Sequence, residues 1–307
     1  MTTRDISTRH LRYFLAAAQS GQFSLAAHAV HVSQTAITTT IGRLESMLGV
    51  KLFERRPHGV ALTAEGRHFL EHAQAVLSTL RDATRAPTMH TYDISGTVRI
   101  AATGTVMGYF LAPYLARFRR THPKIELKLV EMIRPALEDR LHRVDNDIDV
   151  VIAVSSNLSR KEGLVIDTLV RSRRQLWTST DHPLCLASEV SLKEISEYPL
   201  VKLTVDESGE SASRYWRKQH RAPNVLLETE SMEAVRSFVG LGLGVTILAD
   251  LVFRPWTLDG RKIETRPITD VVPPMELGIV RNMNHEESPA AQALNRFLKD
   301  ACSIAHF

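Results

Sequence analysis

The sequence predicts an N-terminal all-α winged helix-turn-helix domain with a long linker helix, followed by a C-terminal α/β domain of two lobes. Three observations predict this fold class. Three helical stripes and a basic hairpin precede residue 63, an unbroken helical pattern covers residues 64–86, and strands alternate with helices from about residue 96 onward. A chain of 307 residues with 44% hydrophobic composition also favours more than one domain.

The first three helices are predicted from their apolar spacing and their end residues. Residues 8–20 carry a helical stripe that Gly21 ends, and Ser24 is expected to cap the next helix. Ser33 is expected to cap a third helix, which Gly49 ends. The apolar residues of this third helix lie at spacings of 4, 3 and 4 and should face inward together, namely Ile37, Ile41, Leu44 and Leu48.

The short turn before the third helix predicts a helix-turn-helix unit, whose second helix enters the major groove of DNA. Since isoleucines occupy the inner face, the polar residues between them must point outward. Short hydroxyl side chains let a helix approach DNA closely and bond to base edges or phosphates. The alternative is that the three consecutive threonines Thr38, Thr39 and Thr40 are only solvated. From these three residues alone, that alternative is favoured. The candidate contacts are Thr35, Thr38, Thr39 and Arg43.

Two short extended runs flank Arg56-Pro57-His58-Gly59, which predicts a hairpin with a basic tip. As the wing of the domain, this hairpin would place Arg55, Arg56 and His58 near backbone phosphates or a minor groove. An ordinary exposed basic turn is the alternative. The neighbouring helical unit favours the wing.

The long helix of residues 64–86 is expected to be capped by Thr63, with Glu65 at its positive end. At about 1.5 Å per residue it would be roughly 33 Å long, too long for so small a domain to bury alone. Its apolar residues recur at spacings of 4, 3, 4 and 3, which is typical of a coiled-coil seam between two copies of the chain. The alternative is a core helix packed on its own chain. The residues of this seam are Phe69, Ala73, Val76, Leu80 and Ala83.

The charge of the chain is uneven. Residues 1–86 hold 10 Lys and Arg against 6 Asp and Glu, whereas the other 221 residues hold 28 of each. The whole net charge of +4 therefore lies in the first quarter, which weakly favours a nucleic-acid partner. No apolar run approaches the length of a membrane span, and the N-terminus does not have the pattern of a signal peptide. Cys185 and Cys302 lie 117 residues apart, as in a reduced cytoplasmic protein.

Beyond a polar linker, the alternation of strands and helices predicts an α/β domain with a mostly parallel sheet. Strands are expected at 96–103, 124–132, 148–154, within 164–180, and at 199–204, 225–229 and 244–249. Helices are expected at 107–121, 135–144, 211–220, 231–240 and 289–302. The expected domains are 1–63, the linker helix and hinge at 64–95, and 96–307, with lobe I at about 96–166 and 269–307 and lobe II at about 167–268.

The run "LRYFLAAAQSGQFSLAAHAVHVSQTAITTTIGRLESMLGVKLFERRPHGVALTAEG", residues 11–66, resembles the LysR-type transcriptional regulators. The resemblance continues through "GTVRI", "HPKIELKLVE", "IDVVIA" and "VRSFVGLGLGVTILA", so it covers nearly the whole chain. It adds Ser33 and Gln34 to the DNA-contact candidates, and Gln34 could bond bidentately to adenine. The family often has Pro where this chain has Thr35 and a long side chain where it has Thr39, so its base preference does not transfer.

The resemblance implies a homodimer or homotetramer built through the linker helix and the effector domains. Such regulators bind promoter DNA at two sites and bend it. A small molecule between two lobes like those of periplasmic binding proteins alters the bend and the access of RNA polymerase.

An effector is expected outside the carboxyl ends of strands, as in other open α/β sheets. The turn Thr103-Gly104-Thr105 suits a carboxylate, although simple capping of the following helix is an equal alternative. Arg134 could pair with an anion or could be an ordinary surface charge. Asp206 and Glu207 are expected near the same effector site, where they would oppose acidic ligands or bind an amine. The further candidates are Ile133, Ser155, Thr204, Val205 and Thr229, with Ser231 expected to be a helix cap.

No nucleophile–base pair or cofactor motif indicates an enzyme. The run "GLGLG", residues 240–244, lies between a helix and a strand, the reverse of a dinucleotide fingerprint. The 13 histidines suggest no metal site, and no cofactor is expected. We therefore expect a cytoplasmic, non-enzymatic regulator that responds to a small molecule, most simply a small organic acid. An enzyme with an accessory DNA-binding domain and an architectural DNA binder without an effector are the competing hypotheses.

Overall fold

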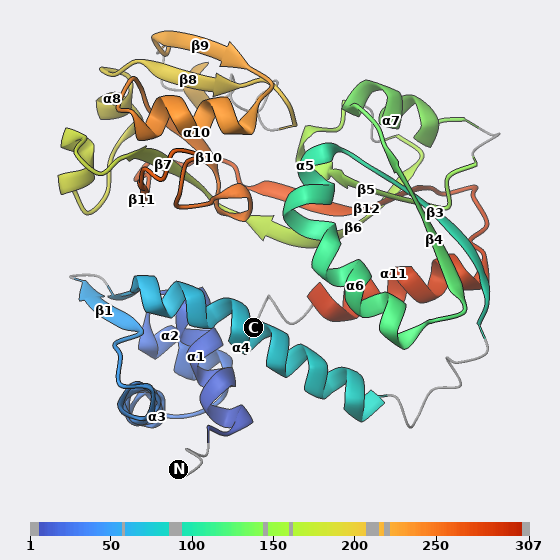
Figure 1. Ribbon diagram of the computed structural model, residues 1–307, viewed down its shortest axis with the longest axis horizontal. Coiled ribbons are helices and arrows are strands. Elements are labelled where there is room, and N and C mark those ends of the chain that lie inside the picture. The colour runs from blue at the N-terminus through green and yellow to red at the C-terminus, as the bar shows by residue number, and fades with distance from the viewer. Residues whose placement is uncertain are drawn as a thin grey trace. The chain divides into compact units, whose positions relative to one another are not determined.

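The computed structural model describes residues 6–56, 59–85, 94–143, 147–159, 162–206, 215–217 and 222–302 (Figure 1). The chain folds into two compact units. Unit 1 comprises residues 1–93 and 300–307, and unit 2 comprises residues 94–299. No helix in the described part of the chain is long and apolar enough to cross a membrane.

Three helices begin unit 1: α1 (Thr8–Ser20), α2 (Phe23–Ala29) and α3 (Gln34–Leu48). Gly21 and Gly49 end α1 and α3 in the left-handed conformation, with φ of 66° and 75°, which glycine adopts without steric cost. Ser33 caps α3 as expected, since its side chain accepts a hydrogen bond from Ala36 N–H. The expectation that Ser24 caps α2 is wrong, because the helix begins one residue earlier and Gln22 is its N-cap.

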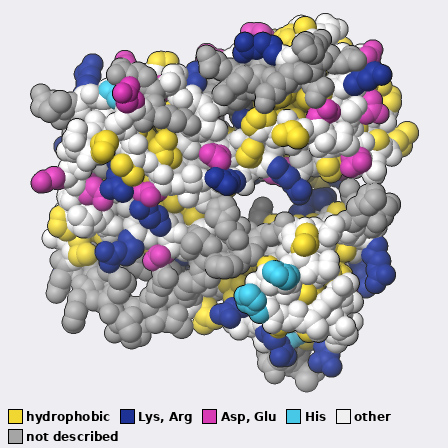
Figure 2. All heavy atoms as spheres, turned by 180° about the vertical axis from the view of Figure 1, so that it is seen from behind, with side chains coloured by type: hydrophobic (Ala, Val, Ile, Leu, Met, Phe, Trp, Pro, Cys, Tyr) yellow, Lys and Arg dark blue, Asp and Glu magenta, His cyan; other side chains and the backbone are white. Residues whose placement is uncertain are grey.

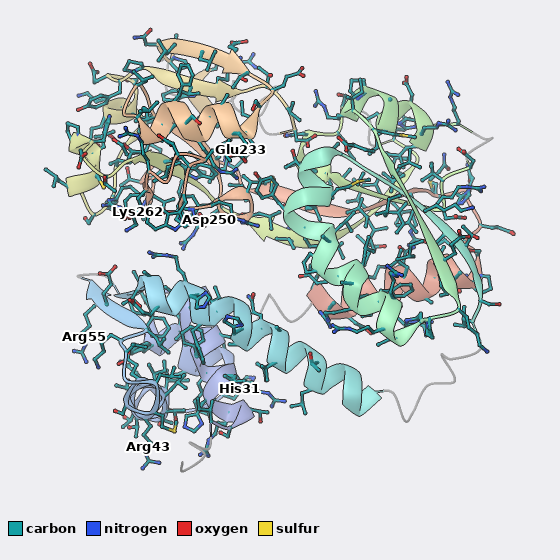
Figure 3. All side chains as sticks on the ribbon, viewed as in Figure 1. His31, Arg43, Arg55, Glu233, Asp250 and Lys262 are labelled. Carbon is teal, nitrogen blue, oxygen red and sulfur yellow. The ribbon has the colours of Figure 1, made fainter. Side chains whose placement is uncertain are left out.

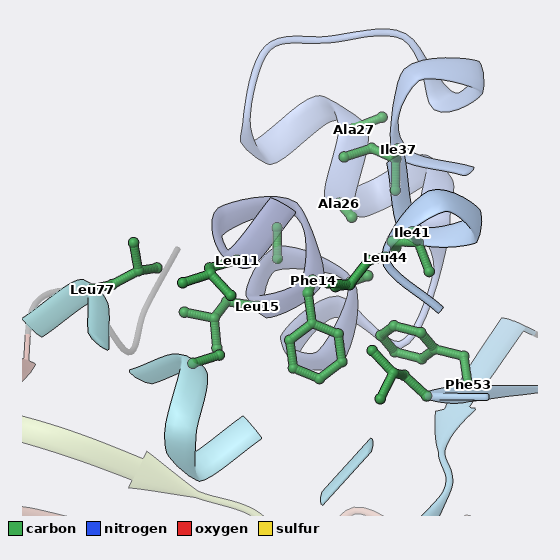
Figure 4. Packing of buried hydrophobic residues seen from close by; sticks show 14 residues of the cluster. Leu11, Phe14, Leu15, Ala26, Ala27, Ile37, Ile41, Leu44, Phe53 and Leu77 are labelled. Atoms are coloured by element: carbon green, nitrogen blue, oxygen red, sulfur yellow. The ribbon is translucent and has the colours of Figure 1, made fainter. Parts of the chain in front are cut away.

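The core of unit 1 forms around Phe14 (Figure 4). Its ring lies 5.3 Å from the ring of Phe53 and 5.0 Å from that of Phe69, measured between centroids. The inward residues of α3 complete the cluster, because Ile37, Ile41 and Leu44 are all buried. The 4-3 spacing in the sequence therefore gave the inner face of α3 correctly, although Leu48 is only half-buried.

The wing is a two-stranded antiparallel hairpin of β1 (Phe53–Arg56) and β2 (Gly59–Leu62). Gly59 has a φ of 146°, and a Cβ atom at this position would stand 2.2 Å from the carbonyl oxygen of Gly21. Only glycine allows this approach, and Val60 N–H then donates to the same carbonyl at 2.7 Å. This contact holds the hairpin against the end of α1. The expected tip residue His58 lies outside the described residues.

Helix α4 (Ala64–Arg85) begins at Thr63, whose hydroxyl accepts a hydrogen bond from Gly66 N–H at 2.9 Å. Its apolar stripe has two halves. Phe69 and Ala73 pack into the core of their own chain, together with Leu77. Val76 and Leu80 instead leave 52% and 42% of their surface exposed. The side chain of Ala83 lies outside the described residues, so the exposed half of the seam rests on Val76 and Leu80.

Lobe I of unit 2 contains a five-stranded sheet in the order β4-β3-β5-β12-β6. These strands are β3 (Gly96–Ala102), β4 (Ile125–Glu131), β5 (Val150–Val154), β6 (Leu164–Ser172) and β12 (Met275–Asn282). β3 pairs in parallel with β4 and β5, but β12 is antiparallel to both β5 and β6. Four of these five strands therefore run in the same direction, as expected for a mostly parallel sheet, and β12, which the sequence did not indicate, runs opposite to them.

Helices join the strands of this lobe. One helical segment runs through α5 (Gly104–Val106), the π-helical turn Met107–Leu111 and α6 (Ala112–Thr121). α7 (Arg134–Leu141) follows β4, the short 3-10 helix Ser155–Asn157 follows β5, and α11 (Pro289–Cys302) closes the lobe. The first segment thus begins at Gly104, three residues before the expected start at Met107.

Lobe II contains a three-stranded antiparallel sheet in the order β10-β7-β11 and a parallel pair of β8 and β9. Their bounds are β7 (Arg174–Ser179), β8 (Leu200–Leu203), β9 (Val225–Thr229), β10 (Thr246–Ala249) and β11 (Ile263–Arg266). The helices are α8 (Leu192–Ile195) and α10 (Met232–Gly240), with 3-10 turns at Pro183–Leu186 and Asp250–Val252. Of the helix expected at 211–220, only residues 215–217 are described, and they are helical.

The crossing between the lobes lies later in the chain than expected. β6 pairs with β12 along its whole length up to Ser172, so the chain leaves lobe I after this residue rather than at residue 166. Arg174 then opens β7, which lies at the centre of the lobe II sheet.

Candidate DNA-binding surface and effector site

One side of α3 is exposed at its N-terminal half. Gln34, Thr35, Thr39 and Arg43 are exposed, whereas Thr38 is half-buried. Two of the hydroxyls are engaged locally, since Ser33 caps the helix and Thr38 Oγ1 donates to the carbonyl of Gln34 at 3.0 Å. The exposed set leaves amide, hydroxyl and guanidinium groups directed to solvent on one helix face, where they can reach a groove.

A buried carboxylate that no sequence pattern indicated joins α3 to the wing. Glu45 has only 7% of its surface exposed. Its Oε1 accepts hydrogen bonds from Leu52 N–H at 2.9 Å and Phe53 N–H at 3.2 Å, and its Oε2 lies 2.6 Å from Lys51 Nζ. These bonds hold the start of β1 against α3. The helix and the wing are therefore fixed relative to each other within unit 1.

The basic residues of this surface come from both elements. Arg43 belongs to α3 and Arg55 to β1, and Figure 3 shows both at the edge of the packed helices. Both are exposed. Arg56 is the last residue of β1, but its side chain lies outside the described set. An exposed pair of guanidinium groups beside a polar helix face suits phosphate contacts.

The turn after β3 holds a buried hydroxyl without a partner. Thr103 is 4% exposed, and its Oγ1 makes no hydrogen bond in the structure. Thr103 is also the N-cap of the helical segment that begins at Gly104, but its side chain does not cap it. The alternative that Thr103 serves only as a cap is thus not supported. Thr105 is half-buried on the first turn of the same segment.

A carboxylate of the protein already lies against this turn. A Cβ atom at Gly104 would stand 2.7 Å from Glu131 Oε1, so the exposed Glu131 side chain lies close against this glycine. Glu131 is the last residue of β4, which pairs with β3. A negative charge at the first turn of a helix is favourable. An acidic ligand at the same turn would therefore have to compete with Glu131.

Asn157, which sequence reasoning missed, lies near Arg134. Arg134 Nη1 donates to the backbone carbonyl of Asn157 at 2.8 Å, so the guanidinium is held by the end of the 3-10 helix after β5. Asn157 is 8% exposed, and neither its Nδ2 nor its Oδ1 has a partner. Ile133 by contrast leaves 73% of its surface exposed, and Ser155 is buried with its hydroxyl bonded to the carbonyl of Glu276 at 3.3 Å.

In lobe II the candidates gather after β8 and β9. Thr204 N–H donates to the carbonyl of Thr229 at 2.8 Å, which places the ends of the two strands together. Thr229 Oγ1 accepts from Ser231 N–H, and Ser231 caps α10 as expected. Thr204 is exposed and Val205 half-buried. Asp206 has an unusual φ of 53°, is buried, and has no partner at Oδ2.

Two family models together cover most of the chain. The model of the bacterial regulatory helix-turn-helix protein, lysR family, matches residues 8–67, and that of the LysR substrate binding domain matches residues 93–303. The chain belongs to the LysR family. It is a DNA-binding transcriptional regulator with an effector-binding domain, and not an enzyme.

The similarity to known relatives extends over nearly the full length of the chain. The uncharacterized HTH-type transcriptional regulator YnfL of Escherichia coli is 29% identical over 97% of this chain and 99% of its own. A solved LysR-family regulator of Pseudomonas aeruginosa, PA01, covers 96% of this chain and 98% of its own at a TM-score of 0.63 and 22% identity. Full-length CbnR was solved in complex with its target DNA. The match covers 97% of this chain and 100% of the CbnR chain, at a TM-score of 0.55 and 21% identity. These structural similarities concern the fold.

A cationic contact joins the two lobes of the LysR effector domain. Arg236 on α10 is 3% exposed, yet it donates to the hydroxyl of Tyr109 in the π-helical turn and to Glu233 on its own helix. The guanidinium carbons of Arg236 and Arg254 lie 5.4 Å and 5.1 Å from the centre of the Tyr109 ring. Such contacts stabilise cations over aromatic faces. The only sequence signal was a charged residue within the apolar run of α10.

Among the described residues of the LysR chain, no group of three or more His, Cys, Asp or Glu side chains is arranged to hold a metal ion. Burial raises the pKa of the Cys185 thiol, which makes it a poor nucleophile. Cys302 is buried.

Proposed function

We propose that this LysR-family regulator reads promoter DNA with the exposed face of α3 and positions it with the wing. Gln34, Thr35 and Thr39 are suited to base edges, and Arg43 and Arg55 to phosphates or guanine. Ser33 and Thr38 support this face by bonding within the helix, and Arg56 adds charge to the wing. The observation that carries the proposal is the polar, exposed face of a helix whose opposite face is buried at Ile37, Ile41 and Leu44. The CbnR complex with target DNA supports it by fold.

The effector is proposed to bind between the lobes, at the carboxyl ends of β3, β4 and β5 in lobe I and of β8 and β9 in lobe II. Thr103 and Asn157 offer buried hydrogen-bonding groups that no protein group satisfies, and unsatisfied buried polar groups are costly unless a ligand or water pairs with them. Arg134 supplies a positive charge. These groups fit a small organic acid, with Gly104, Thr105, Thr204 and Thr229 at its border.

Effector binding would reach the rest of the molecule through the segment that starts at Gly104. Tyr109 lies on this segment and contacts Arg236 of lobe II. A ligand that shifts the first turn therefore shifts a contact between the lobes. In the proposed mechanism this movement alters the bend of the DNA and the access of RNA polymerase.

Self-association is proposed to use two surfaces. The first is the exposed half of the α4 stripe, Val76 and Leu80. The second is a groove of about 820 Å³ between α6 and β4, where Leu129 leaves 53% of its surface exposed. β4 is an edge strand of the lobe I sheet, and unpaired edges tend to be covered. Two such surfaces per chain support a homotetramer that acts in the cytoplasm.

A thermal-shift screen of small carboxylic acids, amines and uncharged heterocycles against the full-length protein tests the effector class. We expect stabilisation by an acid, lost when Arg134 is changed to Ala and retained when the exposed Arg120 of α6 is changed to Ala. Stabilisation by amines alone, or by an acid equally in both variants, would argue against the proposed site.

A further inference from the structure

Two histidines on α4 form a pair that the proposed function does not use. His68 and His72 are four residues apart and therefore lie on the same helix face. Both are exposed, their Nε2 atoms are 3.3 Å apart, and their ring planes are at 87°. In the sequence, His68-x-x-Glu71-His72 has the spacing of a metal-binding helix. Figure 2 shows histidine side chains on the surface of the molecule.

The separation of the two nitrogens fits a metal ion between them. Zinc–nitrogen bonds are about 2.0–2.1 Å long, so a tetrahedral angle places two ligand nitrogens about 3.3 Å apart. A right angle would place them about 2.9 Å apart. The observed 3.3 Å is the tetrahedral value. The two Nε2 atoms are also within hydrogen-bond distance of each other, and an ion bound between them would replace that hydrogen bond.

We infer that His68 and His72 bind a divalent late first-row transition-metal ion, with Zn²⁺ as the reference ion. Neutral imidazole is a good ligand for such ions, whereas Mg²⁺ and Ca²⁺ prefer oxygen. No third protein ligand is grouped with the pair in the described part of the chain, so water or buffer completes the coordination. The site binds metal but does not perform the peptidase chemistry with which the spacing is associated elsewhere.

Metal bound at this site would clamp one turn of α4. The pair lies between the capped start of the helix at Thr63 and the exposed residues Val76 and Leu80. A ligand that binds the folded helix only shifts its equilibrium toward the folded state. The ion would thus stabilise the segment that continues from the DNA-binding domain, and this effect does not depend on any effector.

Titration calorimetry of the full-length protein with Zn²⁺ at pH 8, with Mg²⁺ in parallel, tests the site. We expect about one Zn²⁺ per chain and no measurable Mg²⁺ binding. Changing a group outside the ligand set often weakens metal binding 10–100-fold, so His72→Gln, which removes a ligand, should weaken it at least about tenfold.

His28→Gln is the matched control, because His28 is also an exposed histidine on a helix of unit 1. It should bind Zn²⁺ as the unchanged protein does. Zn²⁺ should also raise the melting temperature of the unchanged protein and of His28→Gln, but not that of His72→Gln. Equal zinc affinity in all three proteins, or an equal loss in both variants, would overturn the assignment.

Discussion

Replacing Glu45 by Ala should separate the recognition helix from the wing. The buried carboxylate of Glu45 accepts hydrogen bonds from the backbone N–H groups of Leu52 and Phe53, which are themselves buried. After the substitution, neither donor has an acceptor at this place, and water does not reach them without opening the contact between α3 and β1.

The cost follows from the two lost bonds. A buried donor left without a partner costs about 1–3 kcal/mol, so the variant should lose about 3 kcal/mol of unfolding free energy in unit 1. Lys51 adds little, because its side chain is 78% exposed and surface ion pairs contribute about 0–1 kcal/mol. Lys51→Ala is therefore the matched control. For a unit of this size, 3 kcal/mol corresponds to a melting temperature lower by about 15 °C.

The tryptophans allow this loss to be assigned to one unit. Trp177, Trp216 and Trp256 all lie in unit 2, so tryptophan fluorescence reports on that unit, whereas far-ultraviolet circular dichroism reports on both. Glu45→Ala should produce an earlier circular-dichroism transition and leave the fluorescence transition unchanged. A loss below about 0.5 kcal/mol, or a fluorescence transition that shifts by the same amount, would refute the reasoning about Glu45.

Three further changes test other parts of the structure. Leu80→Asp should weaken self-association at least about tenfold, because burying a leucine contributes about 1.5–3 kcal/mol. Light scattering measures this as a lower molar mass in solution, and an unchanged molar mass would contradict pairing through α4. Burial lowers the pKa of His182, whose Nδ1 also accepts from Leu184 N–H. The unfolded state therefore binds protons first, so stability in unit 2 should be complete above about pH 6.5 and fall below it. Urea unfolding followed by fluorescence at pH 7.5 and 5.5 should show that His182→Gln loses less unfolding free energy between the two pH values than the unchanged protein. An equal loss in both proteins would be evidence against this role of His182. Glu131→Gln should strengthen binding of an acidic effector about fivefold, or about 1 kcal/mol, by removing a nearby like charge, and weaker binding would argue that Glu131 contacts the ligand.

The helices of unit 1 could be predicted because their signals are local. Gly21 and Gly49 end helices, Ser33 and Thr63 cap them, and the isoleucines of α3 repeat at helical spacing. Each signal depends on neighbours within a few residues. The start of α2 was misjudged because Ser24 is a plausible cap by type, although the backbone is already helical at Phe23.

Strand β12 and the contacts of the effector domain could not be predicted in this way. β12 lies between β5 and β6, and its pairing partners are more than a hundred residues away along the chain. The contact between Tyr109 and Arg236 joins residues 127 positions apart. The unpartnered amide of Asn157 becomes visible only when the burial of the 3-10 helix after β5 is known. Such features depend on the assembled fold and have no local signature.

The most direct test of the account is a binding titration with two DNA duplexes, one from the region that flanks the gene and one with the same composition in scrambled order. A bidentate base contact contributes about 1–3 kcal/mol of discrimination, so Gln34→Ala should lose at least about fivefold affinity for the first duplex and little for the second. Gln292→Ala on α11 is the control and should leave both affinities unchanged. Equal losses on both duplexes, or no preference between them by the unchanged protein, would contradict base recognition by α3.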